Sequence, residues 1–248
     1  MEVPKSHPRY ESLTQRGKIE EGVKEGYVAL VGMVAHGRGE CFDYLMGEKT
    51  TNTAEKAERV AAAVLLKAKN PVISINGNVA ALCAREVVYL AKSLNAKIEV
   101  NLFYWDEERE KRMDAILRKN GADEVYGTNE EFKVKVPNLD SKRGRVDERG
   151  IYNADVVLVP LEDGDRTETL VAMGKTVVAI DLNPLSRTAQ KASLSVIDNV
   201  TRAIPNIRKF SDELDKGEID YVIEDFNNKK NLKESINEMK NNLDRLSL

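Results

Sequence analysis

Asn76-Gly77-Asn78 has the composition of an anion-binding turn. It follows the β-branched run Pro71-Val-Ile-Ser-Ile75 and leads into a helical pattern. Glycine permits a close backbone approach or a positive φ, and the amides and dipole of a helix start favour an anion. The two asparagines would add side-chain donors for a phosphate or a carboxylate. An ordinary strand–helix turn with an asparagine cap fits the same residues about equally well.

Segment 161–168 is rich in carboxylates and follows an apolar run. It contains Glu162, Asp163, Asp165 and Glu168 beside Arg166. Such a group could hold Mg²⁺ or position an amine. Acidic residues are also favoured by the dipole in the first turn of any helix. For each single carboxylate here, that ordinary role is the more common explanation.

Segment 180–188 combines residues that suit a nucleotide. Asp181 follows an apolar strand pattern, where a carboxylate can accept hydrogen bonds from ribose hydroxyls. Asn183 can donate to and accept from a base edge, and Arg187 is placed where it could meet a phosphate. Turn and capping roles explain these residues as well. For Asp198-Asn199, a polar pair after the apolar run 194–197, capping is the preferred interpretation of the residues alone.

Residues 32–39 superficially resemble a phosphate-binding P-loop, G-x-x-x-x-G-K-[ST]. Arg38 replaces the lysine, Gly39 replaces the hydroxyl residue, and the preceding segment has helical periodicity. The P-loop mechanism therefore fails on two residues and on context. A glycine-flanked Arg38 beside His36 could still bind a phosphate, as could Arg16 on the preceding helical segment. For either arginine alone, a surface ion pair is the more common role.

Alternating strand and helix patterns must position these segments. Short apolar runs predict strands at 71–75, 97–103, 154–160 and 176–181, with a shorter one at 124–126, and helical spacing predicts helices at 79–94, 106–120, 166–173 and 201–217. Strands that alternate with helices form βαβ units, so we expect a parallel sheet covered on both faces. Ligands of such sheets bind outside the carboxyl ends of the strands, where the polar segments lie.

The N-terminal part is predicted to be helical. Residues 8–46 should form two or three helices bent at glycines, and Asn52 or Thr53 should cap a further helix at 54–69. The predicted buried face of residues 8–46 consists of apolar residues at three- and four-residue spacing: Ile19, Val23, Tyr27, Leu30, Val31 and Val34.

The two remaining segments are less regular. Residues 127–153 are predicted to be a long loop without regular structure, and such loops are usually functional or mobile. From about residue 229 the chain is predicted to be helical, with a heptad seam that packs either on its own domain or on a second subunit. The seam consists of Leu232, Ile236, Met239, Leu243 and Leu246. We therefore expect one α/β domain over 1–248, with a helical N-terminal region (1–69), a βα core (70–217) and a helical tail (218–248).

Composition excludes several classes of protein. The chain has 248 residues, of which 42% are hydrophobic and 32% charged, which excludes disorder and low complexity. The net charge of −3 argues against nucleic-acid binding. No apolar segment is long enough to span a membrane, and no apolar signal core is seen, so a cytoplasmic location is expected. Cys41 and Cys83 are expected to be reduced thiols, and the scattered cysteines and histidines predict no bound structural metal.

Several motifs occur together along the chain. They are His7-Pro8-Arg9-Tyr10 with Thr14-Gln15-Arg16, Ala35-His36-Gly37-Arg38-Gly39-Glu40, Ser74-Ile75-Asn76-Gly77-Asn78, and Asp181-Leu182-Asn183-Pro184-Leu185-Ser186-Arg187-Thr188. Taken together, these segments resemble archaeal phosphopantothenate synthetases. The likeness extends over nearly the whole chain and is more specific than any single motif.

The resemblance implies a fold, an assembly and a reaction. The fold would be a Rossmann-like three-layer α/β core with a mostly parallel sheet, a helical N-terminal region and a C-terminal helix, assembled as a homodimer. The reaction would join 4-phosphopantoate to β-alanine with ATP, giving 4′-phosphopantothenate, AMP and pyrophosphate through an acyl-adenylate, in coenzyme A biosynthesis. The ATP contacts implied by the resemblance are Arg16, Arg38, Asp181, Leu182, Asn183, Arg187, Thr188, Asp198 and Asn199.

This chemistry brings two anions together, so cationic groups must neutralise charge. Arg16, Arg38 and Arg187 are the candidate catalytic residues, with Mg²⁺ on the phosphates of ATP. The candidates for binding phosphopantoate are Asn76, Gly77 and Asn78. The β-alanine amine must lose a proton, and the residues alone do not choose among His36, Asp163 and Asp165 as the base.

Two other functions fit the same fold class. An NAD-dependent oxidoreductase would need a glycine-rich dinucleotide turn, and the G-x-G-x-x-G fingerprint is absent from the sequence. A non-catalytic nucleotide-binding protein would bind ATP without turnover and use its C-terminal helix for a partner.

Overall fold

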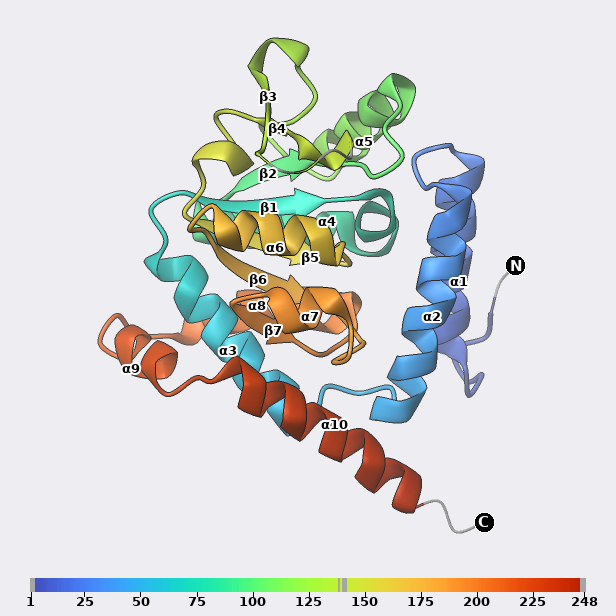
Figure 1. The fold of residues 1–248 in the computed structure, drawn as a ribbon. Helices are drawn as coiled ribbons and strands as arrows, with labels where there is room; N and C mark the ends of the chain where they lie inside the picture. Colours follow the sequence, from blue (N-terminus) through green and yellow to red (C-terminus); the bar gives the residue numbers. More distant parts are fainter. Residues whose placement is uncertain (1–2, 138, 140–141, 246–248) are drawn as a thin grey trace.

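The computed structural model describes residues 3–137, 139 and 142–245 and has an α/β architecture (Figure 1). A five-stranded parallel sheet lies between two layers of helices, as expected for a Rossmann-like core. Its strands are β1 (Pro71–Ile75), β2 (Lys97–Val100), β5 (Val156–Pro160), β6 (Thr176–Ile180) and β7 (Leu194–Val196). A separate antiparallel hairpin consists of β3 (Lys133–Lys135) and β4 (Arg145–Asp147).

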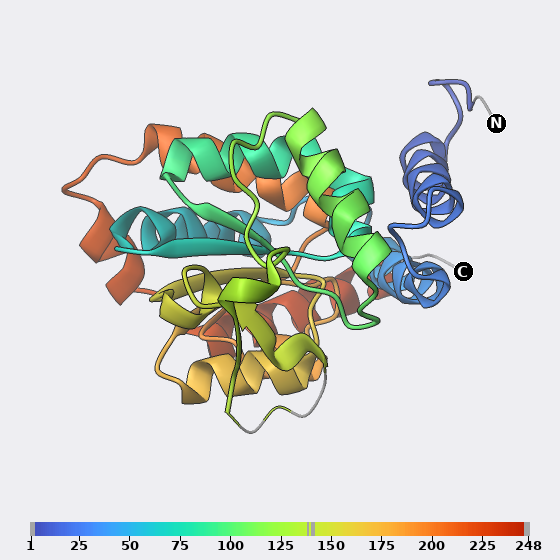
Figure 2. The ribbon, with the colours of Figure 1, turned by 90° about the horizontal axis from the view of Figure 1, so that it is seen from above.

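Ten α-helices are present in the described part of the chain. They are α1 (Tyr10–Lys24), α2 (Leu30–Met46), α3 (Asn52–Lys67), α4 (Gly77–Leu94), α5 (Glu107–Lys119), α6 (Gly164–Ala172), α7 (Arg187–Lys191), α8 (Val200–Glu213), α9 (Ile219–Glu224) and α10 (Asn228–Asp244). Helices α3, α4 and α8 cover one face of the sheet, whereas α6 and the hairpin cover the other (Figures 1 and 2).

The strand order of the sheet is β2-β1-β5-β6-β7. The chain moves from β1 to β2 on one side and then crosses back to place β5 on the other side of β1. The connections therefore reverse direction between β1 and β5. In open parallel sheets, this reversal leaves a crevice at the carboxyl ends of the two strands, and ligands bind there.

Side chains on successive strand positions enter two different cores, which is the period-2 pattern of a strand covered on both faces. Ile73 and Ile75 pack with α4 and α8, whereas Val72 packs with Val157 and with Leu170 of α6. All five residues of β1 and all five of β5 are buried, as their near-continuous apolar sequences predict.

The N-terminal helices partly contradict the expected burial pattern. Two helices form in 8–46, as predicted, and Ile19 and Tyr27 are buried. Leu30, Val31 and Val34 are exposed by 73%, 45% and 64%, so their assignment to a buried face was wrong. The connection 25–29 turns the chain, and α2 then presents these residues away from the core. The prediction of Asn52 or Thr53 as the cap of α3 was also wrong, because the Thr51 side chain accepts from the Ala54 amide.

Segment 127–153 has more structure than predicted. It forms the β3–β4 hairpin and three short 3-10 helices, η1 (Glu130–Phe132), η2 (Lys142–Gly144) and η3 (Ile151–Asn153). Glu99 of β2 accepts hydrogen bonds from the amides of Asp147 (3.0 Å) and Ile151 (2.6 Å). This anchor within the core explains why the segment is ordered. Figure 2 shows it over the sheet, between α5 and α6. The expected strand at 124–126 is reduced to one bridge between Tyr126 and Glu99.

The C-terminal part is also divided differently. The helix predicted at 201–217 ends at Glu213, and a separate short α9 follows. In α10, Leu232 and Met239 are buried against Met46 and Ile197, while Ile236 and Leu243 are 38% and 51% exposed. Two of the four described residues of the predicted heptad seam thus pack on their own chain. Leu246 lies outside the described residues. The organisation as a single domain stays a prediction.

Candidate active site

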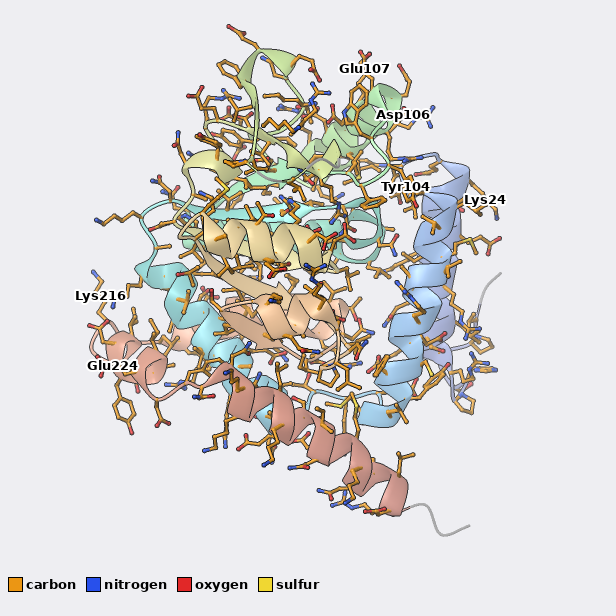
Figure 3. The ribbon with its side chains drawn as sticks, viewed as in Figure 1. Lys24, Tyr104, Asp106, Glu107, Lys216 and Glu224 are labelled. Atoms are coloured by element: carbon orange, nitrogen blue, oxygen red, sulfur yellow. The ribbon has the colours of Figure 1, made fainter. Side chains whose placement is uncertain are left out.

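A cavity of about 820 Å³ lies at the carboxyl ends of the parallel strands, between the sheet and α2. Its lining comes from α2, the β1–α4 turn, the connection after β2, the β5–α6 loop and the β6–α7 loop. In the view of Figure 3, Tyr104 of the connection after β2 lies on the side of the core that faces α1 and α2. The volume lies within the usual range for small-molecule sites. The cavity therefore lies where ligands of open parallel sheets bind, at the reversal of strand order.

The β6–α7 loop, residues 181–188, is held by its own side chains. Asp181 accepts hydrogen bonds from the Asn183 amide (3.0 Å) and the Ser186 hydroxyl (2.5 Å), and burial raises the pKa of this carboxyl. The Thr188 hydroxyl donates to the Glu162 carbonyl (2.7 Å), which fixes the loop to its neighbour. Asp181, Leu182, Asn183, Arg187 and Thr188 all line the cavity.

Helix α2 contributes His36 and Arg38 to the opposite wall of the cavity. Within the described part of the chain, His36 Nε2 is buried without a hydrogen-bond partner, and burial lowers the pKa of this imidazole. His36 is therefore neutral near pH 7 and able to accept a proton. Arg38 forms no hydrogen bond or ion pair with any described residue, but its charge acts on the Asp181 carboxylate. Arg187 forms ion pairs with Asp165 and Glu168 at the exposed rim.

Two of the residues expected to contact ATP do not line this cavity. Arg16 binds Glu40 with two nitrogens, Nε and Nη2, at 3.0 and 2.6 Å. Asp198 is 2% exposed and accepts from Thr50 (2.6 Å) and Arg202 (2.5 Å). Asn199 does line the cavity, and it also caps α8 by accepting from the Thr201 amide. These three residues have structural partners in this conformation.

The β1–α4 turn is already saturated with internal contacts. Asn76 caps α4, and its amide nitrogen donates to the carbonyls of Pro160 (3.1 Å) and Leu161 (3.0 Å) across the strand reversal. Asn78 donates to the Gly32 carbonyl (2.9 Å). A Cβ on Gly77 would lie 2.5 Å from the Tyr27 carbonyl oxygen. These contacts hold the turn against the α1–α2 connection, so the asparagine amide groups are occupied by the protein itself.

A buried ionic cluster lies on the β5 side of the cavity, where Arg143 and Ser74 join residues of segment 161–168. We define the buried cluster as Ser74, Arg143, Glu162, Asp163 and Arg166. Arg143 pairs with Glu162 and, at 3.1 Å, with Asp163, while Arg166 pairs with the same Glu162 and donates to Ser74 (3.1 Å). Arg143 and Arg166 are 5% and 1% exposed, and burial lowers the pKa of each to about 10. Both are therefore charged at neutral pH.

Arg143 reaches this cluster from the segment predicted to be an unstructured loop. The Asn101 amide, just after β2, donates to the carbonyls of Arg143 (3.2 Å) and Arg145 (3.1 Å) and so fixes the backbone. Arg109, the other arginine of this wall, donates to the Tyr104 carbonyl (2.5 Å). The only sequence signal for Arg143 was the unusual length of the segment.

The family assignment rests on a match to a protein-family model. The model describes phosphopantothenate/pantothenate synthetase and matches residues 53–242, which is more than half of the chain. The chain belongs to this synthetase family. The match contains the β1–α4 turn, the buried cluster and the β6–α7 loop, whereas His36 and Arg38 precede it.

Relatives of this synthetase-family chain extend the likeness to the N-terminal helices. A protein of Thermococcus onnurineus, named 4-phosphopantoate–β-alanine ligase, is 50% identical over 100% of this chain and 95% of its own length. Proteins with the same name are 50% identical in Thermococcus kodakarensis, over 99% and 95%, and 51% identical in Methanosarcina mazei, over 98% and 96%. The likeness therefore includes α1 and α2.

A second cavity of about 910 Å³ adjoins the first in this synthetase-family structure. Phe103, Asp163, Gly164 and Arg187 line both cavities. The second one lies over α6 and carries Asp165 and Glu168. Over the residues the structure describes, no three histidine, cysteine or acidic side chains are grouped to hold a metal ion, and no helix is long and apolar enough to cross a membrane.

Proposed function

We propose that this protein is an ATP-dependent 4-phosphopantoate–β-alanine ligase of coenzyme A biosynthesis. The supporting observation is identity of about 50%, over nearly the full length of both chains, to relatives with that name. The cavity at the strand reversal supports the same assignment, because it provides arginines for anions beside a loop suited to a nucleotide. The family relationship favours this activity over an oxidoreductase or a non-catalytic nucleotide-binding protein.

The first step we propose is adenylation of the acid. A carboxylate oxygen of 4-phosphopantoate attacks the α-phosphorus of ATP, the bond to the β-phosphate oxygen breaks, and pyrophosphate leaves. Attack between two anions requires cationic groups at the reacting centre. Arg38 of α2 and Arg187 of the β6–α7 loop both line the cavity and suit that role. Asp181 and Asn183 would orient the ribose or the base.

Three further residues are assigned to the proposed ATP site on the resemblance to the family alone: Arg16, Asp198 and Asn199. Arg16 would have to exchange its contact with Glu40 for a phosphate. Asn199 lines the cavity, and Asp198 would act through Asn199 by accepting a hydrogen bond from its backbone amide.

The second step we propose is amide formation. The β-alanine nitrogen attacks the acyl carbon, AMP leaves with the bonding electrons, and the nitrogen loses a proton. We assign the proton acceptor to His36, because burial holds its imidazole neutral and Nε2 has no partner within the described structure. Asp165, by contrast, is exposed and engaged by Arg187. Asp163, which lies between the two cavities, is placed to attract the incoming ammonium group.

Mg²⁺ is proposed to enter with ATP. A cation of this kind is commonly held by substrate phosphates and water together with one or two carboxylates. The carboxylates nearest the shared edge of the cavities, Asp163 and Asp165, fit that limited role. Bound Mg²⁺ would neutralise phosphate charge during adenylation.

A homodimer and a cytoplasmic location complete the proposal. The exposed apolar residues Leu30, Met33 and Val34 of α2 form a face suited to a second copy of the chain. Both cysteines are free, as is usual in a reducing compartment. We expect sedimentation to report a dimer for the native chain and a monomer for Val34→Asp, and a native monomer would contradict the dimer.

A product assay tests the proposed activity. The protein is incubated with ATP, 4-phosphopantoate and β-alanine, and AMP is resolved from ADP. We expect AMP and pyrophosphate in equal amounts to 4′-phosphopantothenate, and no amide when any substrate is omitted. Release of ADP and phosphate would instead indicate an acyl-phosphate intermediate. Stabilisation by NAD rather than ATP in a thermal melt, or ATP binding without turnover, would support the alternative functions.

A further inference from the structure

Arg143 is a buried arginine of the cavity whose hydrogen-bond donors are not all used by the described residues. It is 5% exposed, and within the described residues its buried Nε has no hydrogen-bond partner. A buried guanidinium normally has its donors satisfied, since an unsatisfied donor costs free energy. Arg143 also lines the cavity of about 820 Å³, about 6 Å from the Phe103 ring on the same wall. The Arg143 guanidinium therefore lies where a ligand in the cavity could contact it.

The charges around Arg143 leave room for an anion. Arg143 and Arg166 share the Glu162 carboxylate, so two buried cations compete for one fully buried anion. The remaining partner of Arg143, Asp163, has a side chain that is 45% exposed at the cavity edge. A carboxylate in that position can turn towards solvent or a ligand. Arg143 would then lose one of its two carboxylate partners.

No asparagine amide of the β1–α4 turn competes for this anion. The side-chain amides of Asn76 and Asn78 are already donated to backbone carbonyls. Gly77 lies against the Tyr27 carbonyl, so its backbone does not face an open space on that side. The cationic side chains left on this wall of the cavity are Arg109 and Arg143.

Strand spacing separates Arg143 from the proposed adenylation centre. Arg143 lies over the ends of β2 and β5, where Asn101 and Glu162 hold it, whereas Asp181 and Asn183 follow β6. The guanidinium of Arg143 pairs with Glu162 after β5, and β5 neighbours β6, so it lies one strand spacing, roughly 4.8 Å, to the β5 side of that centre. A substrate with a carboxylate at one end and a phosphate at the other would direct its phosphate away from β6.

We propose that Arg143 binds the phosphate of 4-phosphopantoate and makes the enzyme selective for the phosphorylated acid. The inference rests on the proposed function and assigns the phosphate end of that substrate to the buried cluster. The rigid guanidinium fork suits two phosphate oxygens, and the fixed backbone of the η2–β4 segment places it before the substrate arrives.

The test compares 4-phosphopantoate with pantoate, which lacks the phosphate, in the native protein and in Arg143→Gln. We expect Arg143→Gln to lower kcat/KM for 4-phosphopantoate about 10- to 100-fold, the usual effect of losing a hydrogen bond between charged groups. The kcat/KM for pantoate should change less than about twofold, and the KM for ATP should not change. An equal loss for both acids would overturn the proposal, since Arg143 would then serve the fold or the carboxylate.

Two further variants keep the test decisive. Arg145→Gln removes a neighbouring, more exposed arginine that pairs with Glu130, and it should leave both kcat/KM values unchanged. Arg143→Lys keeps the charge and loses the fork, so it should fold if Arg143→Gln does not and should still lose selectivity for the phosphorylated acid. The assignment would be refuted if Arg143→Gln folds and both variants still prefer 4-phosphopantoate to pantoate as strongly as the native protein does. Absence of AMP formation by the native protein would instead refute the proposed function.

Discussion

Arginines on the two sides of the cavity are held in opposite ways. On the β6 side we count Arg187 and also Arg38, which acts on Asp181 from the facing helix α2. Arg38 forms no ion pair with a described residue, and Arg187 pairs with exposed carboxylates at the rim. On the β5 side, Arg143 and Arg166 are buried and share Glu162. An exposed arginine can change partners when a ligand arrives, whereas a buried one is fixed by the fold. The β6 side is therefore suited to charge that moves during adenylation, and the β5 side to a group that stays in place.

The difference also separates effects on stability from effects on activity. Breaking a buried ion pair leaves an uncompensated charge away from water, whereas an exposed pair contributes little to folding. Substitutions in the buried cluster should consequently alter the free energy of unfolding. Substitutions on the β6 side should alter catalysis and leave the fold unchanged.

The largest effect is expected for Arg166→Met. Arg166 is 1% exposed, and its removal leaves Glu162 with Arg143 alone. We expect a loss of about 3–5 kcal/mol in the free energy of unfolding, measured by urea denaturation. For a chain of this size this lowers Tm by roughly 10 °C.

Two controls accompany Arg166→Met. Arg187→Met removes an exposed arginine and should leave Tm nearly unchanged. Adding Glu162→Gln to Arg166→Met should cost less than the sum of the single changes, because both changes break the same ion pair. Equal losses for Arg166→Met and Arg187→Met would show that the two sides do not differ in stability.

Sequence periodicity predicted the core better than the site. The strands at 71–75 and 176–181 were recognisable because buried strands carry near-continuous apolar residues. Spacing identifies residues that share a face, but it does not reveal whether anything covers that face, so Leu30 and Val34 were assigned to a core they do not enter. Asp181 was proposed because it follows a strand directly and Arg187 because it follows the capping Ser186, and both line the cavity.

Arg143 could not be found in this way. Its burial depends on Asn101, a residue 42 positions earlier in the chain, and on Glu162 of a later loop. No local pattern in 127–153 reports these long-range contacts. The ordered hairpin was missed for the same reason, since Glu99 anchors it from β2.

A second large effect is expected from pH. Burial raises the pKa of Glu99, which anchors the segment carrying Arg143, from its usual 4.5 to about 7. The folded protein therefore retains a proton that the unfolded chain releases near pH 4.5. The stabilisation is complete below pH 4.5 and is lost as the pH rises through 7. The change is on the order of 3 kcal/mol, at about 1.4 kcal/mol for each pKa unit.

Denaturation in urea between pH 5 and pH 9 measures this dependence. Glu99→Gln is the matched variant, and it should be less stable overall, because both carboxylate oxygens accept from backbone amides and a single amide oxygen cannot. Its stability should vary less with pH than that of the native protein. If the free energy of unfolding varies with pH in the same way in both proteins, Glu99 does not titrate in this range. The β5 side would then be more accessible to water than its burial indicates.

The smallest expected effect in free energy is that of Arg38→Ala, and it should appear only in catalysis. Arg38 forms no hydrogen bond or ion pair with any described residue, so its removal should change the free energy of unfolding by less than about 0.5 kcal/mol. Loss of its charge beside the adenylation centre should lower kcat/KM at least about tenfold, which corresponds to about 1.4 kcal/mol. Pyrophosphate release with 4-phosphopantoate as the varied substrate measures it, with Arg38→Lys as the control that keeps the charge. A native rate in Arg38→Ala would show that Arg38 does not act in catalysis and would assign the catalytic charge to Arg187. A large loss of stability in Arg38→Ala would show that Arg38 supports the fold as the buried arginines do, and the two sides of the cavity would then not differ.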